Sequence, residues 1–462
     1  MPQIKYDELF DEDSFVKTLV LARGDGLGDT SGDSLVTGYG TLGERLVFAA
    51  VDESSGTGAL HGRNFSDRVI RTLEAAVVHG APFIMCLGGS SIDISRGARA
   101  LVAYTGLINA LKRAKGKIPL ICVAGSDCIG IHSALASMCD FVYLCGEDTY
   151  FGAVSAAGVK AFAYGEPDAA AGKDPVPQGL RASGNAEKLA GVYPDTAALR
   201  SGLTELISFL PESHRSGMPK FDFDFTLEPS GDIAGLRGRE LIKAISDDAD
   251  FLELGCNYGR EVITGFAAFG GRAAGVIGFD TSETDGKVGA KGIRKLASFT
   301  EFCRAFRIPG VNLLDFSGIF ARSSAEAEEL PACIARLCDA MSSMNASGHN
   351  LSRRGSVSFI TGTACGELAA VIMAASVDNA GSIAYAWRGA SVDAIDPAAA
   401  ALMKYKDQIK ADPDPAAART KYIDLYKRQY STAEAAGYES LLDDVIDPAE
   451  TRNRVIDYLR II

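Results

Sequence analysis

The sequence lacks several features that would assign it to a specialised class of protein. It has no apolar run long enough to span a membrane, so we expect no transmembrane helix. Its N-terminal stretch, MPQIKYDELFDEDSF, is charged and has no apolar core, so we expect no signal peptide. Positive charge is also in short supply. The net charge of −13 argues against nucleic acid or an anionic membrane as the main partner.

The ten cysteines form no CxxC pair and no cluster with histidine. Most of them lie in apolar runs such as FIMCLGG, LICVAG and FVYLCGE. This pattern predicts reduced, buried thiols in a cytoplasmic protein, and it argues against a disulfide framework or a zinc site. We therefore expect no bound metal.

The sequence does contain enough hydrophobic material for more than one core. The chain has 462 residues, of which 47% are hydrophobic and 23% are charged. This composition is typical of a globular protein, and the length allows two or three domains.

The chain contains an internal repeat. TGYGTLGERLVFAAVD, which starts at Thr37, matches TGFAAFGGRAAGVIGFD, which starts at Thr264, and further on IPLICVAGSDCIGIH matches VSFITGTACGELAA. Self-similarity over such a long period predicts two homologous α/β domains. We expect an N-terminal domain over residues 1–215, a linker rich in Pro, Gly and Ser over residues 216–235, and a C-terminal domain over residues 236–462.

Each domain is expected to begin with a hairpin, followed by helices that alternate with buried strands. In the first domain the hairpin turns at LGER, between the strands LVTGYG and LVFAAVD. The apolar runs FIMCLG and LICVAG are typical of strands covered on both faces. Residues 165–179 are predicted to form a surface loop.

Each domain also has a strand-to-helix corner with the pattern Gly-Ser/Thr-x-Cys, at residues 125–128 and 362–365. A cysteine nucleophile there would need a base or a lowered pKa, and a Cys128–His132 pair is one hypothesis. The sequence favours small buried cysteines at tight turns instead. The first N–H groups of the helix are a second possibility. They lack intrahelical acceptors, and two adjacent ones can form an oxyanion hole.

Several stretches, taken in chain order, point to one known family. They are DELFDEDSFVK, VTGYGTLGERLVFAAVD, GKIPLICVAGSDCIGIHSALASMCDFVYLCGEDTYFG, FITGTACGELAAVIM, IAYAW and GYESLLDDVIDPAETRNRVIDYL. Over nearly its whole length the chain resembles the carboxyltransferase (β) subunit of biotin-dependent acyl-CoA carboxylases, of the propionyl-CoA carboxylase β type. The resemblance implies two tandem crotonase-like domains, the first on the biotin side and the second on the acyl-CoA side.

The resemblance also implies an activity and its partners. A carboxyl group would move between carboxybiotin, held on a biotin carboxylase or biotin carrier subunit, and the α-carbon of an acyl-CoA. Main-chain amides would stabilise the biotin ureido oxygen at the first corner and the thioester enolate at the second. The resemblance further implies a homo-oligomer, a hexamer or a dimer, with active sites between the N-domain of one subunit and the C-domain of another.

The implied site residues follow by position. The amide donors are carried over to Gly130, Ile131, Glu367 and Leu368. The positions implied to bind substrate are Gly88, Gly89, Gly318, Ile319 and Ala370, the last of which aligns with the family residue that tunes acyl-chain choice.

Two departures from the family pattern keep alternatives open. The family usually has two consecutive glycines at each corner, where this chain has Gly130-Ile131 and Gly366-Glu367. The N–H survives each change, but a carboxylate at Glu367 disfavours an enolate. One alternative is a non-catalytic homologue that acts as a scaffold or regulator. The other is a crotonase-type acyl-CoA enzyme without biotin, for which Glu367 is a candidate acid. Met403-Lys404 resembles a biotin-attachment site, but its setting predicts a helix face.

Overall fold

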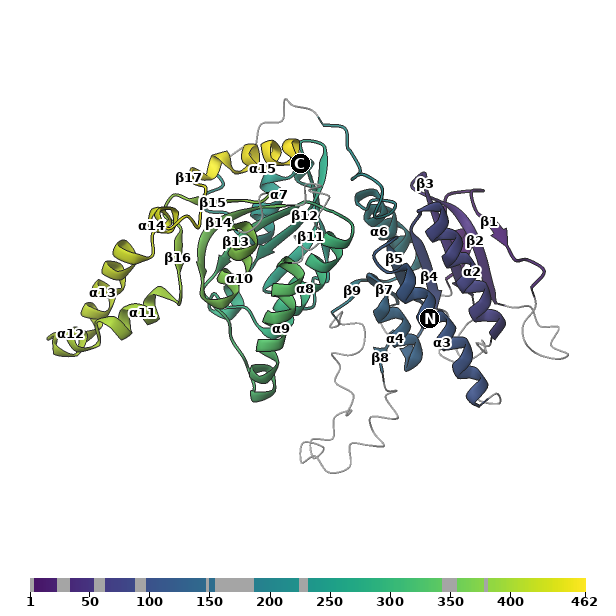
Figure 1. The fold of residues 1–462 in the computed structure, drawn as a ribbon, viewed down its shortest axis with the longest axis horizontal. Coiled ribbons are helices and arrows are strands. Elements are labelled where there is room, and N and C mark those ends of the chain that lie inside the picture. Colours follow the sequence, from purple (N-terminus) through teal and green to yellow (C-terminus); the bar gives the residue numbers. More distant parts are fainter. Residues whose placement is uncertain are drawn as a thin grey trace. The chain divides into compact units, whose positions relative to one another are not determined.

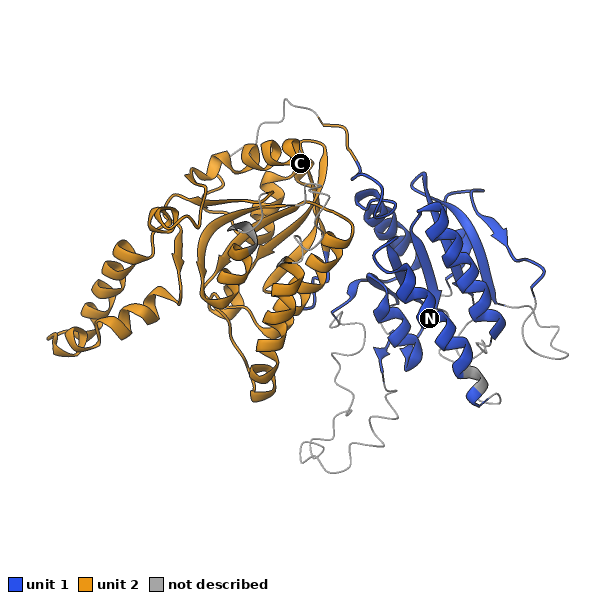
Figure 2. Cartoon of the chain, viewed as in Figure 1, with its two compact units in different colours: residues 1–219, 254–258 blue, residues 220–253, 259–462 orange. Residues whose placement is uncertain are grey.

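A computed structural model of the chain describes residues 4–22, 34–53, 63–87, 97–146, 149–153, 187–223, 232–342, 355–377 and 381–462. The chain divides into two units, residues 1–219 with 254–258 and residues 220–253 with 259–462 (Figure 2). Each unit has a main β-sheet with helices packed on it (Figure 1). The predicted loop at 165–179 and the middle of the predicted linker lie outside the described residues.

The sheet of the first unit has seven strands in the order β1-β2-β3-β4-β5-β7-β9. The strands are β1 (Val16–Thr18), β2 (Leu35–Leu42), β3 (Arg45–Asp52), β4 (Phe83–Leu87), β5 (Leu120–Ala124), β7 (Phe141–Cys145) and β9 (Leu189–Tyr193). β1, β2 and β3 are antiparallel, and from β3 onward all neighbours are parallel. The helices are α1 (Tyr6–Leu9), α2 (Arg63–His79), α3 (Ala98–Ala114), α4 (Ile131–Met138) and α6 (Thr196–Phe209).

The second unit repeats this plan. Its strands are β10 (Leu252–Leu254), β11 (Val262–Phe269), β12 (Arg272–Phe279), β13 (Gly310–Phe316), β14 (Ser356–Cys365), β15 (Ile383–Trp387), β16 (Ser391–Asp393) and β17 (Asp444–Ile446). β11 and β12 form a hairpin, and β12, β13, β14, β15 and β17 run parallel. The helices are α7 (Gly238–Ile245), α8 (Ala290–Ala305), α9 (Ser324–Ser342), α10 (Gly366–Val377), α11 (Pro397–Lys404), α12 (Lys406–Ala411), α13 (Pro415–Tyr430), α14 (Ala433–Tyr438) and α15 (Thr451–Ile461).

The strands predicted from the sequence are confirmed. The hairpin β2–β3 turns at LGER, and every residue of β4 and of β5 is buried, as expected for strands covered on both faces. The strand predicted to precede the second corner is longer than expected. β14 continues through Gly362 as far as Cys365, because Thr363, Ala364 and Cys365 pair with the short strand β16.

The repeat is conserved in the geometry of the two hairpins. β2 and β3 begin and end 227 residues before β11 and β12, the same offset that separates Thr37 from Thr264. Both turns have positive φ at their two central residues, Gly43-Glu44 in the first unit and Gly270-Gly271 in the second. This is the type I′ geometry, whose twist matches that of the flanking strands.

Each hairpin turn is held by an aspartate from a distant segment. In the first unit Asp11 accepts the N–H groups of Gly43 and Glu44, at 3.2 and 2.9 Å, and pairs with Arg200 of α6. In the second unit Asp247 accepts the N–H groups of both turn glycines, at 3.0 and 2.8 Å, and pairs with Arg452 of α15 at 2.6 Å. We call this arrangement the turn clamp.

A buried cation occupies equivalent positions under each hairpin. Arg68 of α2 donates to the carbonyl of Leu35 at 2.6 Å, and Lys295 of α8 donates to the carbonyl of Val262 at 2.7 Å. Both pairs are related by the same offset of 227 residues. The two units therefore share buried polar contacts as well as topology.

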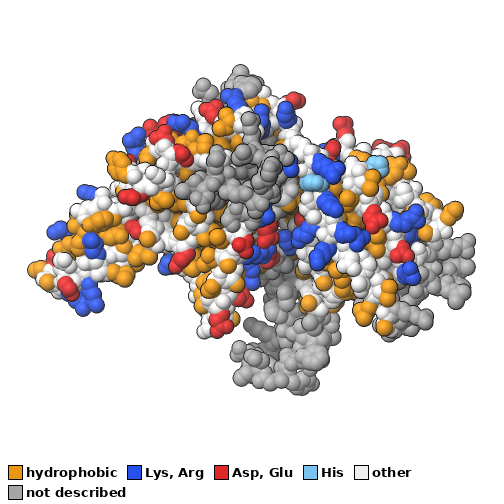
Figure 3. Space-filling model, in the orientation of Figure 1, with side chains coloured by type: hydrophobic (Ala, Val, Ile, Leu, Met, Phe, Trp, Pro, Cys, Tyr) orange, Lys and Arg blue, Asp and Glu red, His pale blue; other side chains and the backbone are white. Residues whose placement is uncertain are grey.

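The second unit has an addition, a helical arm formed by α11, α12 and α13 (Figure 1). Asp396 and Asp414 cap the N-termini of α11 and α13, each followed by a proline at the first helical position. Ala418 is the only residue of α13 that is fully buried. Hydrophobic side chains lie on the surface of the arm (Figure 3), among them Met403, which is 74% exposed. Met403 and Lys404 form the last turn of α11, which confirms the prediction of a helix face.

In the part of the chain that the structure describes, no helix combines the length and apolar character needed to cross a membrane.

Candidate active site

The corner of the first unit connects β5 to α4 through the short strand β6 (Cys128–Ile129). β6 pairs with β8 (Phe151–Gly152), and Asp127 accepts the N–H of Tyr150 at 2.9 Å. Gly130 is the N-cap of α4, and its carbonyl accepts from Ala134 N and Ser133 Oγ. Hydrogen bonds therefore hold the corner in place both before and after the start of α4.

Gly130 is a glycine because of its backbone conformation. Its φ is +61°, a region that other L-residues rarely adopt, although a Cβ there would meet nothing closer than 3.9 Å. Its N–H donates to the carbonyl of Gly152 at 3.2 Å. Ile131 is the first helical residue, so no carbonyl within α4 can accept from its N–H. Of the two implied donors in this corner, Ile131 is the one whose geometry suits an external oxygen.

Cys128 and His132 do not have the character of a nucleophile and its base. Cys128 is 2% exposed, and burial raises the pKa of its thiol to about 12, with smaller contributions from Cys139 and Asp127. His132 is buried with its Nε2 atom 3.4 Å from the hydroxyl of Tyr104. Cys128 is therefore a packed thiol, as the sequence favoured.

The corner of the second unit connects β14 directly to α10. Gly366 is the first residue of α10 and has a φ of +79°. The N–H groups of Glu367 and Leu368 follow in the first helical turn, where no carbonyl within the helix can accept from them. The Glu367 side chain is exposed, and Leu368 is fully buried. The two implied donors are thus adjacent, with one side chain in solvent and the other in the core.

Asp315 supports this second corner. It lies near the end of β13, accepts the N–H of Thr363 at 2.9 Å and pairs with Arg237 at 2.6 Å. A Cβ on Gly362 would lie only 2.2 Å from the Asp315 carboxylate, so glycine is needed there for close approach. Asp315 and Arg237 were not among the residues predicted from the sequence. The position of Asp315 near the end of a buried strand was the available signal.

The predicted loop at Gly318 and Ile319 lies beside this corner. A Cβ on Gly366 would lie 3.6 Å from the Cα of Gly318. The loop is fixed to Val288, which donates to Gly318 O at 3.0 Å and accepts from Phe320 N at 3.1 Å. The structure therefore brings Gly318 next to the helix start that carries Glu367. Ala370 is exposed one helical turn further along α10.

Cys365 is a core residue of the second corner. It is fully buried, and burial raises the pKa of its thiol to about 12, with added repulsion from Asp396, Asp393 and Glu367. Each of these three carboxylates disfavours the thiolate form of Cys365. Cys365 is therefore a protonated, packed thiol.

The remaining implied positions, Gly88 and Gly89, lie outside the described residues. All ten cysteines are described and none forms a disulfide; eight of them are buried and two, Cys256 and Cys338, are exposed. Among the described residues no group of three or more His, Cys, Asp and Glu side chains is arranged to hold a metal ion.

The fold and the two corners define a class of protein. The family model described as the carboxyl transferase domain matches residues 1–462, so the chain belongs to the carboxyl transferase family. The predicted fold of two tandem crotonase-like domains is confirmed by structural similarity. The chain matches a transcarboxylase 12S crystal structure with a TM-score of 0.83 and 24% identity, over 98% of this chain and 88% of that one.

The relatives of the chain indicate which members of the carboxyl transferase family it resembles. The chain is 26% identical to the methylmalonyl-CoA carboxyltransferase 12S subunit of Propionibacterium freudenreichii subsp. shermanii, over 92% of this chain and 80% of that protein. It is 27% identical to the propionyl-CoA carboxylase beta chain of Cereibacter sphaeroides, over 92% of this chain and 82% of that protein. Family membership confirms the predicted resemblance, and it favours a carboxyltransferase over a scaffold or a biotin-independent enzyme.

Proposed function

We propose that the chain moves a carboxyl group between carboxybiotin on a partner protein and the α-carbon of an acyl-CoA. The observation that carries the proposal is the presence of one strand-to-helix corner in each unit, at equivalent places in the repeat. Each corner ends in a positive-φ glycine followed by main-chain N–H groups without intrahelical acceptors.

The chemistry requires two oxygens to gain negative charge. Bound carboxybiotin would supply the carbon dioxide and, through its ureido group, the base that accepts a proton from the α-carbon of the acyl-CoA. The resulting enolate then forms a carbon–carbon bond to the carbon dioxide. Oriented N–H groups are suited to this task, because they stabilise developing charge without taking part in proton transfer.

In the proposed assignment the first unit binds the biotin ureido oxygen and the second unit binds the thioester oxygen. On the biotin side the assignment rests mainly on Ile131, because the N–H of Gly130 donates to Gly152 O. On the acyl-CoA side it rests on Glu367 and Leu368. Gly318 and Ile319, beside the second corner, and Ala370 on α10 are proposed to line the acyl-CoA site.

The partner and setting follow from the same proposal. The biotin would arrive on a biotin carboxylase or biotin carrier subunit, and the chain would act as a homo-oligomer, either a hexamer or a dimer. The transcarboxylase 12S structure to which the chain is similar is described as a hexamer with methylmalonyl-coenzyme A and methylmalonic acid bound. We also propose a cytoplasmic location, which the absence of disulfides among the ten cysteines supports.

The test is carboxyl transfer in both directions with a biotinylated carrier protein. Labelled carboxyl should pass from the carrier to at least one of acetyl-, propionyl- and butyryl-CoA, and avidin should block the transfer. No turnover with any of these substrates, in an assay where a known carboxyltransferase works, would contradict the proposal.

Proline substitutions test the donors directly, because proline removes the N–H and is tolerated in the first turn of a helix. Ile131→Pro and Glu367→Pro should each lower kcat about 100-fold or more, the typical loss for one oxyanion-hole donor. Ile131→Val and Glu367→Gln keep the N–H and are the matched controls. Equal losses in the proline variants and their controls would show that side chains, and not amides, matter.

A further inference from the structure

The second unit contains a pocket at the end of the sheet opposite the corner. Its walls come from the first residues of β13 and β14, from Ser382 just before β15, and from α8, α9 and α10. The corner, in contrast, follows the last residues of β14. The pocket is therefore separate from the proposed acyl-CoA site, and nothing in the proposed reaction uses it.

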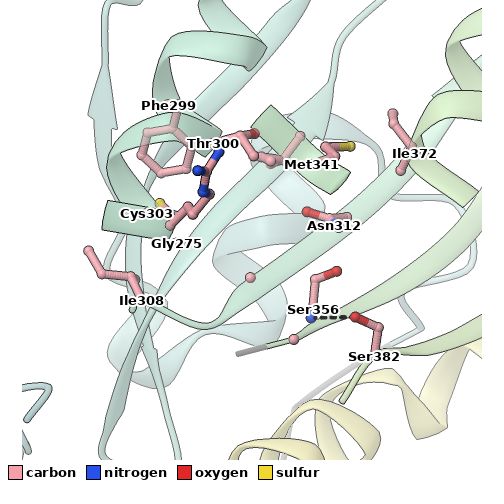
Figure 4. A pocket seen from close by; sticks show the side chains of 14 residues that line it. Gly275, Phe299, Thr300, Cys303, Ile308, Asn312, Met341, Ser356, Ile372 and Ser382 are labelled. Carbon is pink, nitrogen blue, oxygen red and sulfur yellow. Dashed lines mark hydrogen bonds between the residues drawn. The ribbon is translucent and has the colours of Figure 1, made fainter. Parts of the chain in front are cut away.

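The pocket has apolar walls and a polar floor (Figure 4). Phe299, Met341 and Ile372 come from the helices, and they face Asn312 and Ser356 on the sheet. Asn312 is 4% exposed, and its Nδ2 donates to the hydroxyl of Ser358 at 3.0 Å. The floor is thus a fixed polar surface inside a largely apolar enclosure.

Two polar groups of the lining are available to a ligand. The hydroxyl of Thr300 is fully buried and has no hydrogen-bond partner among the described residues, an arrangement that costs free energy unless something binds there. Arg304 also lines the pocket. It donates to the carbonyl of Asp339 at 3.3 Å. A partly exposed guanidinium beside a buried, unpaired hydroxyl favours an anionic guest.

The internal repeat indicates which substitutions open the pocket in the second unit. At the equivalent positions, 227 residues earlier, the first unit has larger or apolar side chains in its core. The pairs are Phe48 for Gly275, Phe83 for Gly310, Leu73 for Thr300 and Met85 for Asn312. Two phenylalanines are replaced by glycine and two apolar residues by polar ones, so the space and its polar lining arise together.

The size of the pocket limits what it can hold. Its volume is about 60 Å³, less than half of the roughly 150 Å³ cavity that takes up benzene. The occupant should therefore have only a few heavy atoms. An inorganic anion would leave the apolar walls without contacts, and a hydrocarbon would leave Thr300 and Arg304 unsatisfied.

We propose that this pocket binds a short-chain monocarboxylate of two or three carbons. The alkyl part lies against Phe299 and Met341, and the carboxylate accepts hydrogen bonds from Thr300 and Arg304. Ile372 connects the pocket to α10, the helix whose first turn carries Glu367 and Leu368. The proposal does not depend on the carboxyl transfer activity, and it can hold or fail on its own.

Amide hydrogen exchange of α8 provides the readout, because this helix contributes Phe299, Thr300 and Arg304 to the pocket. The full-length protein is transferred to heavy water, and exchange is followed by peptide mass spectrometry. Propionate at 20 mM should slow exchange in the peptides of α8 at least fivefold, and the peptides of β2 and β3 in the first unit should be unaffected. Chloride, phosphate and propanol at the same concentration should protect much less.

Substitutions separate the carboxylate site from a simple cavity. Arg304→Gln, and the pair Thr300→Leu with Asn312→Met that copies the first unit, should each abolish protection by propionate. Arg322→Gln, an exposed arginine of the same unit, should leave it intact. Circular dichroism checks that the variants fold. Absence of protection, equal protection by propanol or phosphate, or protection that survives Arg304→Gln would overturn the proposal.

Discussion

Glu367 is the residue at which this chain departs most clearly from what an enolate site requires. Its N–H is a proposed donor, but its side chain carries negative charge into the first turn of α10. The side chain is exposed, so water and salt weaken its field at the corner. Two unit charges 4 Å apart in water interact with about 1 kcal/mol, which is close to a fivefold change in rate.

Glu367→Gln should therefore raise kcat for carboxyl transfer by about fivefold, because the N–H is kept and the repulsion is removed. The gain should shrink as salt is raised from 0.05 to 0.5 M, since the screening length falls. Steady-state rates at the two salt concentrations measure both effects. A loss of activity in this variant would instead assign the carboxylate an active role in the reaction.

The turn clamp predicts that replacing the two equivalent aspartates lowers the free energy of unfolding by different amounts. The pair of Asp247 with Arg452 is buried, with side chains 8% and 5% exposed, whereas Asp11 and Arg200 are 28% and 41% exposed. Asp247→Ala should lower the free energy of unfolding by about 3–5 kcal/mol, because it leaves a buried guanidinium unpaired. Asp11→Ala should cost only about 2 kcal/mol, the value of lost hydrogen bonds to a charged group.

The single tryptophan, Trp387, separates the two outcomes, since it is buried in the second unit and donates to Thr451. In urea titrations Asp247→Ala should shift the transition seen by Trp387 fluorescence. Asp11→Ala should shift only the transition seen by far-ultraviolet circular dichroism. A shift of the fluorescence transition by Asp11→Ala would mean that the units do not unfold independently.

The stabilisation by Asp11 should also depend on pH. Burial acts to raise its pKa, but hydrogen bonds from Glu44, Thr41 and Gly43 and the pairing with Arg200 outweigh this, so the pKa is lowered. An aspartate whose pKa is lowered by folding stabilises the folded state at pH values above its pKa in the unfolded chain, which is near 3.8. This contribution is lost as the pH falls through the pKa of the folded state. The stability difference between wild type and Asp11→Asn should be constant from pH 7 to 5 and shrink below pH 4.

At the scale of elements, comparison of the two hairpins predicts a substitution that stabilises the first unit. Glu44 has a φ of +65° at the position where the second unit has Gly271, with a φ of +73°. A side chain at such a φ costs about 1–2 kcal/mol. Glycine removes this cost, but about half of the gain is offset because glycine gives the unfolded chain more conformational entropy. Glu44→Gly should therefore stabilise the first unit by about 0.5–1 kcal/mol in urea titrations followed by circular dichroism.

The reverse change in the second unit supplies the control. A Cβ on Gly271 would lie 2.5 Å from the carbonyl of Phe221, so Gly271→Ala combines an unfavourable φ with a collision. It should be destabilising by more than Glu44→Gly is stabilising. If both changes proved neutral, the turns would not have the geometry described.

The same elements show how far the sequence could predict the structure. The hairpin turn, β4 and β5, and the glycines at the helix starts were predictable, because apolar runs and turn residues are local signals. The turn clamp was not, since Asp11 and Arg200 meet only after the sheet forms. The pocket depends on side chains that Gly275 and Gly310 lack, and a missing side chain has a consequence only when its neighbours in space are known. Of the site, the sequence indicated the corners and placed Asp315 near the end of a strand, but its contacts with Thr363 and Arg237 depend on the folded unit.

At the scale of the whole molecule, the two units follow one plan and differ in what was added. At the positions of Gly275 and Gly310 in the pocket, the first unit has the core residues Phe48 and Phe83, and the second unit also carries the arm. Exposed hydrophobic residues on the arm include Met403, at 74%, and Tyr430, at 48%. Apolar surface on an extension with so little buried area of its own is typical of a protein–protein interface.

We therefore expect the chain to form a homo-oligomer in which the arm contacts another subunit. Met403→Asp with Tyr430→Asp places charge on that surface and should lower the mass found by size-exclusion chromatography with light scattering. Val78→Asp, at an 82% exposed position on α2, adds a charge elsewhere and should leave the mass unchanged. The arm variant should keep the circular dichroism spectrum of the wild type, because these side chains contribute little to the unit's own core. A monomeric wild type, or the same mass for both variants, would assign the arm another role.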